Sequence, residues 1–461
     1  MRLFDDAEAA QQEAADARQS GGIEVPAHVR RRAVRRPLPQ GLPREEVVID
    51  IPQELKYCAC GQALVRIGEE SSEKLDVIPP RVRVIRTIRP KYACHACEGS
   101  GDEERAAVRI APMPPSLIDK GIASAGLLAF IVTGKFCDAL PLYRQEKQFA
   151  RIGVQLSRRT MADWMIAVAQ ACAPVLQVLE QRVRAGPVLQ IDETSLQVLG
   201  EEDRQDTSLS YMWVARGGPP DSPVVVYRYA PSRAAGAAQD MLGEYEGYVQ
   251  TDGYEVYNRV CAQPGIVHVG CWAHARRMFV EAGKSSKKAG SVQEALGLIG
   301  KLYAVEAERQ SYKKEREFAA ARKAKVEPVL DKLRGWLERK SQQVPPKSAL
   351  GEAVAYTLRQ WPKLVLYLEH PALTPDTNAC ERAIRPFVLG RKNWLFSGSP
   401  RGAHASATLY SLIETARANG VEPYRYLKYL FKKLPLAHSC EDYLALTPEY
   451  LNQGDFDKLS L

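Results

Sequence analysis

The sequence lacks any apolar run approaching the roughly 18–20 residues that a membrane-spanning helix requires. Its first residues, 1–6, also lack the apolar core of a signal peptide. Neither sign of charge dominates: 63 basic residues stand against 55 acidic ones, and the net charge of +8 permits a polyanionic partner without requiring one. These absences predict a soluble, cytoplasmic protein that has no membrane partner.

Three acidic residues stand in contexts typical of a catalytic site. Asp192 ends an apolar run, which predicts a buried strand with a carboxylate at its end. Asp252 follows a similar short run and precedes a glycine turn. Glu381 lies in a segment with a polar start and a late proline, which predicts a short helix with Glu381 and Arg385 one turn apart. We predict that the three acids form one catalytic set.

Acids on separate elements suit metal-assisted phosphodiester chemistry. Cleaving or joining a phosphodiester requires an activated oxygen nucleophile and a stabilised leaving oxygen, which two magnesium ions roughly 3.5–4 Å apart supply together. Magnesium prefers carboxylate oxygens and keeps some of its waters, so two or three acids suffice. We therefore expect Asp192, Asp252 and Glu381 to bind two Mg²⁺, with Mn²⁺ able to substitute.

The segments between the two aspartates predict a β-β-β-α-β order. The expected strands lie at 188–192, 211–215, 224–229 and 247–250, and the expected helix at 234–245. This is the order of the ribonuclease H-like fold, in which the first and fourth strands are neighbours and bring their acids together. A single strand-end aspartate is more often a helix cap or turn former. Three acids in this order favour the catalytic interpretation.

Several longer motifs also occur along the chain. They are IDET at 191–194, TDGY at 251–254, GCWAHARR at 270–277, ERAIRP at 381–386, GRKNWLFS at 390–397 and LYSLIETA at 409–416. Together they resemble the motifs of DDE transposases of the insertion-sequence-66 type, and the resemblance covers residues 3–450. At Thr377 and Cys380 the chain carries residues that differ from those usual in these motifs. Neither difference changes the acid Glu381.

The resemblance implies a transposase that binds the terminal inverted repeats of its insertion sequence. It would cleave the element's ends and join the 3′-hydroxyls to target DNA by two-metal transesterification. The implied partners are double-stranded DNA, a second copy of the chain or a higher assembly on DNA, and two small accessory proteins of the same element. The implied location is the bacterial cytoplasm, at the nucleoid during activity.

Two other functions stay open. One is a non-catalytic DNA-binding regulator derived from a transposase, and the other is a ribonuclease H-like nuclease with a different substrate. Retention of all three acids favours an enzyme over a regulator, because a binding protein would not need them. The DNA-binding candidates in the N-terminal part favour a transposase over the other nuclease, since a transposase must find defined ends. The fold alone would not decide among these functions.

An arginine-rich stretch lies within the polar first 50 residues. It contains Arg30, Arg31, Arg32, Arg35 and Arg36, close to a proline. Such a stretch predicts an extended basic arm that could lie along a DNA groove, or equally a solvated linker. Family members usually carry a longer helical segment ahead of this point, of which only the tail is expected here.

Two cysteine pairs predict a structural zinc site. Cys58 and Cys60 precede a strand-rich stretch, and Cys94 and Cys97 follow it. Two knuckles of this kind fit a tetrahedral four-thiolate Zn²⁺ site on a ribbon of strands. Disulfides are the alternative, which a cytoplasmic setting disfavours. The resembled family carries a zinc-finger-like module at this place.

Cys271 and His274 form a further Cys-x-x-His pattern, with His268 nearby. The same pattern follows the second aspartate in many DDE transposases, so a metal site is one interpretation. A buried thiol beside a hydrogen-bonded core histidine is the other, which the absence of a visible fourth ligand favours.

A helix–turn–helix pattern is predicted at 124–183. Helices are expected at 124–136 and 141–151, followed by a glycine turn and by a helix that Ser157 caps and that runs towards Val183. Arg158 and Arg159 would then begin the second helix of the motif, where recognition helices meet base edges. Any helical hairpin shares this pattern, so the interpretation as a DNA-binding motif depends largely on the predicted catalytic site.

Basic residues also gather near the predicted active site. Those that we expect to contact DNA there are Arg276, Arg277, Arg385, Arg391, Lys392 and Trp394. The alternative is ordinary surface charge beside a core tryptophan.

At 461 residues the chain should contain about three domains. We predict a multidomain α/β protein with a ribonuclease H-like core of mixed sheet and helices. The expected parts are a basic arm at 1–50, a zinc-binding β module at 51–111, a helix-turn-helix-like domain at 112–186, a catalytic domain at 187–420 with a helical insertion at about 284–372, and a helical tail at 421–461.

Overall fold

The structure, a computed structural model, describes residues 43–50, 52–56, 59, 62–65, 67–68, 70, 72–75, 81–93, 108–119, 121–284, 290–451 and 455. The chain divides into two units, Met1–Ile85 and Arg86–Leu461. In the first unit the described residues include the 3-10 helix η1 (Gln53–Lys56). The second unit contains the rest of the described secondary structure, beginning with the antiparallel strands β1 (Lys91–Ala93) and β2 (Val108–Ile110).

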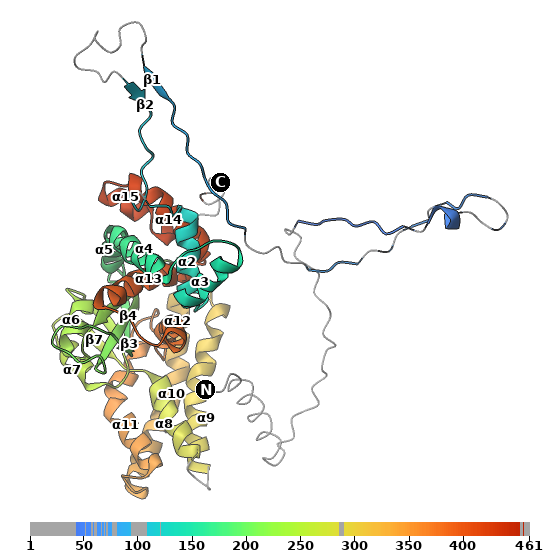
Figure 1. The fold of residues 1–461 in the computed structure, drawn as a ribbon. Coiled ribbons are helices and arrows are strands. Elements are labelled where there is room, and N and C mark those ends of the chain that lie inside the picture. The colour runs from blue at the N-terminus through green and yellow to red at the C-terminus, as the bar shows by residue number, and fades with distance from the viewer. Residues whose placement is uncertain are drawn as a thin grey trace. The chain divides into compact units, whose positions relative to one another are not determined.

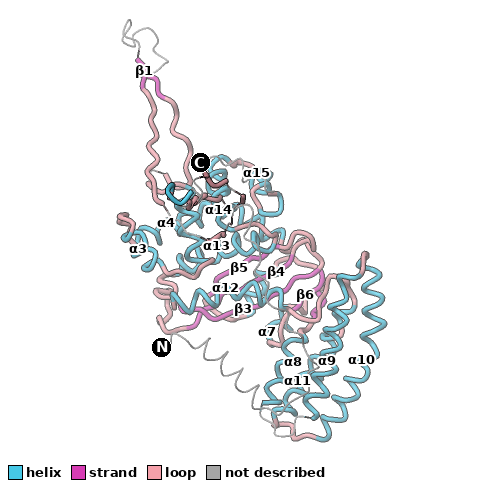
Figure 2. The backbone as a smooth tube through the Cα atoms, turned by 90° about the vertical axis from the view of Figure 1, so that its right-hand side faces the viewer, coloured by secondary structure: helices cyan, strands magenta, loops and turns pink. Residues whose placement is uncertain are grey.

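A five-stranded mixed sheet lies at the centre of the second unit, with strand order β5-β4-β3-β6-β7 (Figure 2). The strands are β3 (Val188–Gln197), β4 (Leu209–Gly217), β5 (Val224–Ala230), β6 (Gly247–Gln250) and β7 (Ile266–Val269). Helix α6 (Ala235–Leu242) lies between β5 and β6, so the predicted β-β-β-α-β order is confirmed. Strand β3 pairs antiparallel with β4 and parallel with β6, which makes the first and fourth strands neighbours as expected. Strand β7 was not predicted.

Helices cover both faces of this sheet. Helix α12 (Asn378–Trp394) packs on the face of β3 and β4 that carries Gln190 and Asp192, and its residue Cys380 lies within 3.8 Å of the Gln190 carbonyl. Helix α7 (Glu255–Val260) packs on the opposite face, where the ring of Tyr257 meets Trp213 at a centroid distance of 6.2 Å. Because successive side chains of a strand alternate between faces, Asp192 and Glu193 are directed to opposite sides of β3.

Helix α12 is longer than predicted. The late proline indicated a short helix, yet α12 continues through Pro386 to Trp394. Proline removes one intrahelical hydrogen bond and strains the preceding turn. Packing compensates for this loss: Phe387 is fully buried, and the Tyr227 hydroxyl donates to the Ala383 carbonyl.

Helix α13 (Pro400–Ala418) closes the free edge of the sheet. Strand β5 is an edge strand, so some of its backbone groups lack a strand partner. The Thr415 hydroxyl donates to the Val225 carbonyl (2.9 Å) and accepts from the Val225 N–H (3.0 Å), while Ser411 accepts from the Tyr227 N–H (2.8 Å). The LYSLIETA motif therefore places two hydroxyls, one helical turn apart, along this edge.

Thr415→Val should lower the free energy of unfolding by about 2–3 kcal/mol, because it leaves two buried backbone groups of Val225 unpaired. Thr408→Val is the matched control, since among the described residues the Thr408 hydroxyl bonds only to the His404 carbonyl of its own helix. Urea unfolding of both variants would check this expectation. Equal losses in the two variants would contradict it.

Helices α2 (Ala125–Phe136), α3 (Leu142–Arg151), α4 (Arg158–Ala171) and α5 (Ala173–Arg182) precede the sheet. The first two agree with the predicted helices. The third predicted helix, expected to run from Arg158 towards Val183, is instead two helices that meet at Cys172 with a bend of 54°. Pro174 explains the break, because it lacks the N–H that would continue the α4 ladder.

The helices before the sheet share one hydrophobic core with the sheet itself. This core also includes residues of α13, of α14 (Pro423–Lys433) and of the segment that contains α15 (Cys440–Ala445). Helix α14 packs on α2, and Figure 1 places both beside α13. The described residues of the segments predicted as a helical domain at 112–186 and a tail at 421–461 thus pack with the sheet as one body.

A second hydrophobic core lies in a helical bundle of α8 (Trp272–Lys284), α9 (Gly290–Ala307), α10 (Glu315–Gln343) and α11 (Ala349–Leu364), which extends from the β6 and β7 side of the sheet (Figures 1 and 2). Arg322 of α10 is 1% exposed and donates to the carbonyls of Tyr367, His370 and Leu373 at 2.8–2.9 Å. It therefore holds the loop that leads into α12.

Within the part of the chain that the structure describes, no single helix has the length and apolar character to cross a membrane, although α4 and α5 taken together across their bend do.

Candidate active site

The structure brings the three predicted acids together beside the middle of β3, because this strand continues past its predicted end at Asp192 to Gln197. Asp192 lies in β3, Asp252 follows the last residue of β6 by two positions, and Glu381 lies in the first turn of α12. Asp252 and Glu381 both interact electrostatically with Asp192. Residues about 60 and 190 positions apart are thus brought together because β3 and β6 are parallel neighbours and α12 crosses the β3 face.

Two buried glutamines hold the three acid-bearing elements in register. Gln190 donates from its amide nitrogen to Gln250 Oε1 (2.9 Å) and to the Asp376 carbonyl (3.2 Å), and its oxygen accepts from the Cys380 N–H (3.2 Å). Gln250 in turn donates to the carbonyls of Gly270 (3.2 Å) and Thr374 (2.8 Å). Each glutamine stands two residues before an aspartate, so its amide fixes the backbone that carries the acid.

Sequence analysis missed these glutamines. The repeated spacing Gln-x-Asp, at 190–192 and 250–252, was the available signal.

Burial and neighbouring negative charge raise the pKa of Asp192 to about 7. Removal from solvent contributes most, followed by the charge of Glu193, with Asp252 and Glu381 adding to it; a hydrogen bond from the Glu193 N–H opposes the rise. The carboxyl group is therefore poorly compensated by the protein alone. A bound cation would supply the missing positive charge.

This raised pKa predicts a pH-dependent stability in the absence of metal. Between about pH 4 and pH 7 the folded state binds more protons at Asp192 than the unfolded state does, so the free energy of unfolding should fall as pH rises, by on the order of 4 kcal/mol. Asp192→Asn should flatten this slope. Urea unfolding at pH 5 and pH 8 in chelator would measure it, and an unchanged slope in the variant would contradict the assignment.

Glu193, on the opposite face of β3, lies in a buried hydrogen-bond network. Its side chain is 2% exposed, and its carboxylate accepts hydrogen bonds from Arg233 (2.6 Å) and from the Tyr257 hydroxyl. The Arg233 guanidinium lies 3.7 Å from the centre of the Tyr254 ring. Because Tyr254 lies in the turn after Asp252 and Tyr257 lies in α7, which follows that turn, this network braces the turn that carries the second aspartate.

The turn after Asp252 leaves little space for a side chain at Gly253. A Cβ on Gly253 would lie 2.5 Å from the Tyr356 hydroxyl, far inside van der Waals contact. The Asp252 carboxylate accepts from the Tyr254 N–H at 2.9 Å, which closes the turn. The TDGY motif is thus explained by local geometry as well as by the acid.

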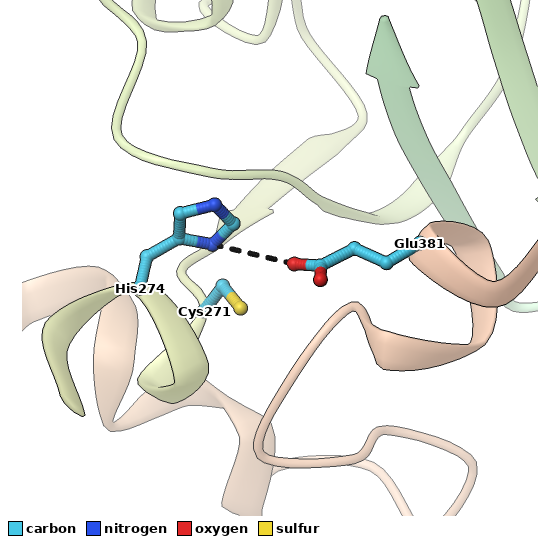
Figure 3. A group of neighbouring side chains, drawn as sticks. All are labelled: Cys271, His274 and Glu381. Carbon is cyan, nitrogen blue, oxygen red and sulfur yellow. Dashed lines mark ion pairs between the residues drawn. The ribbon is translucent and has the colours of Figure 1, made fainter. Parts of the chain in front are cut away.

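Cys271 and His274 join Glu381 in a compact cluster (Figure 3). One possible ligand atom of each residue lies within 4.8 Å of those of the other two. His274 Nδ1 is 3.8 Å from Glu381 Oε1, and Arg277 Nη2 is 3.6 Å from Glu381 Oε2. His268, considered as a further member from the sequence, is directed elsewhere: its Nε2 bonds to the Thr251 hydroxyl (2.8 Å), and burial lowers its pKa to about 3.

The predicted DNA contacts on α12 have different environments. Arg385 and Lys392 are exposed, and Arg391 donates to the hydroxyls of Thr194 (3.1 Å) and Ser195 (3.2 Å) on β3. Trp394 is half-buried: its ring packs on Phe387, at a centroid distance of 5.4 Å, and under the Lys135 ammonium group. Burial lowers the pKa of Lys135 to about 8.

The remaining predicted contacts lie on other helices, and of these Arg277 approaches Glu381. Arg276 and Arg277 are exposed in the second turn of α8, whereas Arg158 and Arg159 are exposed at the start of α4. Ser157 caps α4 as expected, accepting from the Thr160 N–H at 3.1 Å. The basic arm with Arg30, Arg31, Arg32, Arg35 and Arg36 lies outside the described residues, as do Cys58, Cys60, Cys94 and Cys97.

Comparison with family models places most of the chain in known families. Residues 120–405 match the model of the IS66 transposase family, 56–98 match the zinc-finger binding domain of transposase IS66, and 411–448 match the IS66 C-terminal element. Residues 1–47 match a model described as transposase C of IS166 homeodomain.

Similar proteins occur in Sinorhizobium fredii. The uncharacterized protein y4jD is 34% identical over 410 residues, which cover 86% of this chain and 78% of the relative. The uncharacterized proteins y4qI and y4hP are 34% and 32% identical, cover 88% and 90% of this chain, and are themselves covered over 75% and 76% of their lengths.

Proposed function

This chain belongs to the IS66 transposase family, and on that premise we propose that it binds the terminal inverted repeats of its insertion sequence, cleaves the ends and joins the 3′-hydroxyls to target DNA. The observation that carries the proposal is the convergence of Asp192, Asp252 and Glu381 from three separate elements. A purely DNA-binding protein would gain nothing from crowding three carboxylates, since their repulsion costs stability.

The sheet supports a ribonuclease H-like core as the catalytic scaffold. Three antiparallel strands, a helix and a fourth strand parallel to the first are the order expected of that fold. Helix α12 then supplies the last acid after the inserted bundle α8–α11. We propose this fold for residues 187–420, with the insertion placed between β7 and α12.

The residues present fit a divalent metal. Asp192, Asp252 and Glu381 offer the hard carboxylate oxygens that Mg²⁺ and Mn²⁺ prefer, and Glu381 Oε1 is buried without a hydrogen-bond partner among the described residues. When bound, two such ions activate an oxygen nucleophile and stabilise the leaving oxygen of a phosphodiester. These three acids would hold them.

The chain's own residues position the reacting groups. Gln190 and Gln250 set the separation of the two aspartates, and Glu193 with Tyr257 stiffens the turn after β6. Arg385 and Lys392 are exposed on α12, where their charges would contact phosphates. Such preorganisation contributes by holding the scissile phosphate in line with its nucleophile.

Contacts outside the active site would select and hold the DNA. Arg158 and Arg159, exposed at a capped helix start, suit phosphate or base contacts. We propose that the basic arm also binds DNA, together with a zinc module whose ligands are Cys58, Cys60, Cys94 and Cys97. Assembly of two or more copies on DNA, together with two small accessory proteins, would bring both element ends to one target.

The direct test is incubation with labelled DNA that carries the neighbouring terminal inverted repeats, in Mg²⁺. We expect strand cleavage at the repeat ends and 3′-end joining to target DNA. Cleavage at random positions would instead indicate a nuclease, and binding without cleavage by the wild-type chain would indicate a regulator.

Arg385→Ala should reduce the cleavage rate at saturating DNA, by about 10-fold or more, with little change in affinity, because Arg385 lies one turn from Glu381. The double variant Arg158→Ala/Arg159→Ala should instead weaken binding to all sequences and lower the salt slope by about one unit per lost phosphate contact. Rates and dissociation constants across a salt series distinguish the two. Normal cleavage by Arg385→Ala at saturating DNA would show that Arg385 contributes to DNA binding and not to catalysis.

A further inference from the structure

The cluster of Cys271, His274 and Glu381 has an unusual composition for an active site built from carboxylates. Cys271 directly precedes α8, His274 lies in the first turn of α8, and Glu381 enters from α12 (Figure 3). Sulfur, imidazole nitrogen and carboxylate oxygen thus meet within 4.8 Å. The proposed phosphodiester chemistry uses only the last of them.

Two of the three facing atoms have no partner within the described part of the chain. His274 Nδ1 and Glu381 Oε1 are inaccessible to solvent, and neither makes a hydrogen bond there. Their separation of 3.8 Å is too long for a hydrogen bond between them. Buried polar atoms are almost always satisfied, so an orphaned pair that faces across a gap indicates a missing binding partner.

The sulfur lies buried opposite two hydrogen-bond donors of Thr377. Cys271 Sγ accepts hydrogen bonds from the Thr377 N–H (3.4 Å) and the Thr377 hydroxyl (3.3 Å), although it is 3% exposed. Burial raises the pKa of this thiol, and the hydrogen bonds from Thr377 oppose the rise. A bound cation would favour the thiolate strongly, since coordinating thiols are deprotonated.

We propose that Cys271, His274 and Glu381 form a binding site for a borderline divalent cation such as Zn²⁺, distinct in ligand type from the magnesium site. Mixed thiolate, imidazole and carboxylate ligands suit zinc, whereas magnesium takes oxygen ligands almost exclusively. Tetrahedral zinc with bonds of about 2.0–2.3 Å places its ligand atoms roughly 3.3–3.7 Å apart, close to the 3.8 Å between His274 and Glu381.

Three protein ligands leave a fourth position open. This composition is typical of zinc sites that also bind a solvent or substrate oxygen. Glu381 is shared with the proposed catalytic set, so the bound cation would fix the orientation of that carboxylate. The site itself requires no catalysis, and its occupancy is measurable without DNA.

Cobalt binding to the full-length chain tests the site. Cys58, Cys60, Cys94 and Cys97 are first replaced by serine, so that the proposed zinc module does not contribute thiolate–cobalt absorption. This background chain should bind one Co²⁺ with a sulfur-to-cobalt charge-transfer band and the visible bands of tetrahedral cobalt. Adding Cys271→Ser should abolish the charge-transfer band, and either Cys271→Ser or His274→Gln should weaken cobalt binding by at least about 100-fold.

Cys261→Ser is the matched control, because Cys261 is a second buried thiol of the same unit and belongs to no candidate metal cluster in the described residues. It should retain the band and the affinity. Unchanged far-UV circular dichroism in all variants excludes misfolding, and Glu381→Gln should weaken binding in the same way.

Equal cobalt binding by the background chain and by its Cys271→Ser and His274→Gln variants would overturn the proposal. Mg²⁺-dependent strand cleavage by the wild-type chain is measured separately. Cobalt binding without cleavage would support this site and contradict the proposed function, whereas cleavage without cobalt binding would do the reverse.

Discussion

Asp192→Asn, Asp252→Asn and Glu381→Gln should each reduce strand cleavage by on the order of 10³-fold or more and leave DNA affinity within about 2-fold. Each change removes a carboxylate oxygen that would bind metal while keeping the shape of the side chain. The carboxylates repel one another, as the raised pKa of Asp192 indicates. Their removal should therefore not destabilise the fold above pH 7. Cleavage of labelled repeat ends in Mg²⁺, beside equilibrium binding, is the measurement.

Asp240→Asn provides the control for these variants. Asp240 is an exposed acid of α6, on a helix that does not contribute to the catalytic set. Its replacement should leave cleavage unchanged. An acid whose variant cleaves at the wild-type rate would have to be removed from the set, and reduced cleavage by Asp240→Asn would indicate a general effect of net charge on the DNA complex.

Gln190→Leu should lower the free energy of unfolding by about 3–5 kcal/mol and reduce cleavage by at least about 10²-fold. Leucine has nearly the volume of glutamine, so the loss arises from hydrogen bonding. The substitution removes a hydrogen-bond partner from the Gln250 amide oxygen, the Asp376 carbonyl and the Cys380 N–H. Gln190 is only 5% exposed, so water does not replace that partner. Strand β3, strand β6 and helix α12 would then lose their common anchor.

Gln197→Leu is the control on the same strand. It tests whether the loss depends on the buried position of Gln190. The Gln197 amide donates to the Asp206 carbonyl at the exposed end of β3. Its replacement should change the unfolding free energy by no more than about 0.5 kcal/mol. Urea unfolding and cleavage rates of the two variants decide the matter. A Gln190 variant that is destabilised but cleaves normally when folded would show that the glutamine supports the fold without positioning the acids.

Much of the central sheet and its flanking helices could be predicted from local patterns. Apolar runs that end in a carboxylate predicted β3 and β6, because strands buried on both faces are apolar throughout. Ser157 and Pro141 marked the starts of helices α4 and α3, since caps depend on the few residues at a helix end. Patterns were less reliable at prolines. Pro174 broke a helix that was expected to be continuous, whereas Pro386 was expected to end a helix and did not.

The two prolines differ in what surrounds them. Pro174 follows the junction at Cys172, where a bend of 54° redirects the chain. Pro386 is followed by Phe387, which is fully buried against aromatic rings from β5 and α13, so packing offsets the lost hydrogen bond. Local sequence sets the cost of a proline, but tertiary contacts decide whether the helix tolerates it.

By itself the sequence determined the order of the elements from β3 to β6, the acids that these strands position and the family to which the chain belongs, because each depends on neighbours in the chain. Only the tertiary structure decided which side chains meet. Gln190 contacts Asp376 across 186 positions, and Cys271 contacts Thr377 across 106. The long bundle α8–α11 separates these partners in the chain, while the parallel pairing of β3 with β6 and the crossing of α12 bring them together in space. No local pattern encodes such a contact, since its energy depends on the burial that only the assembled fold provides.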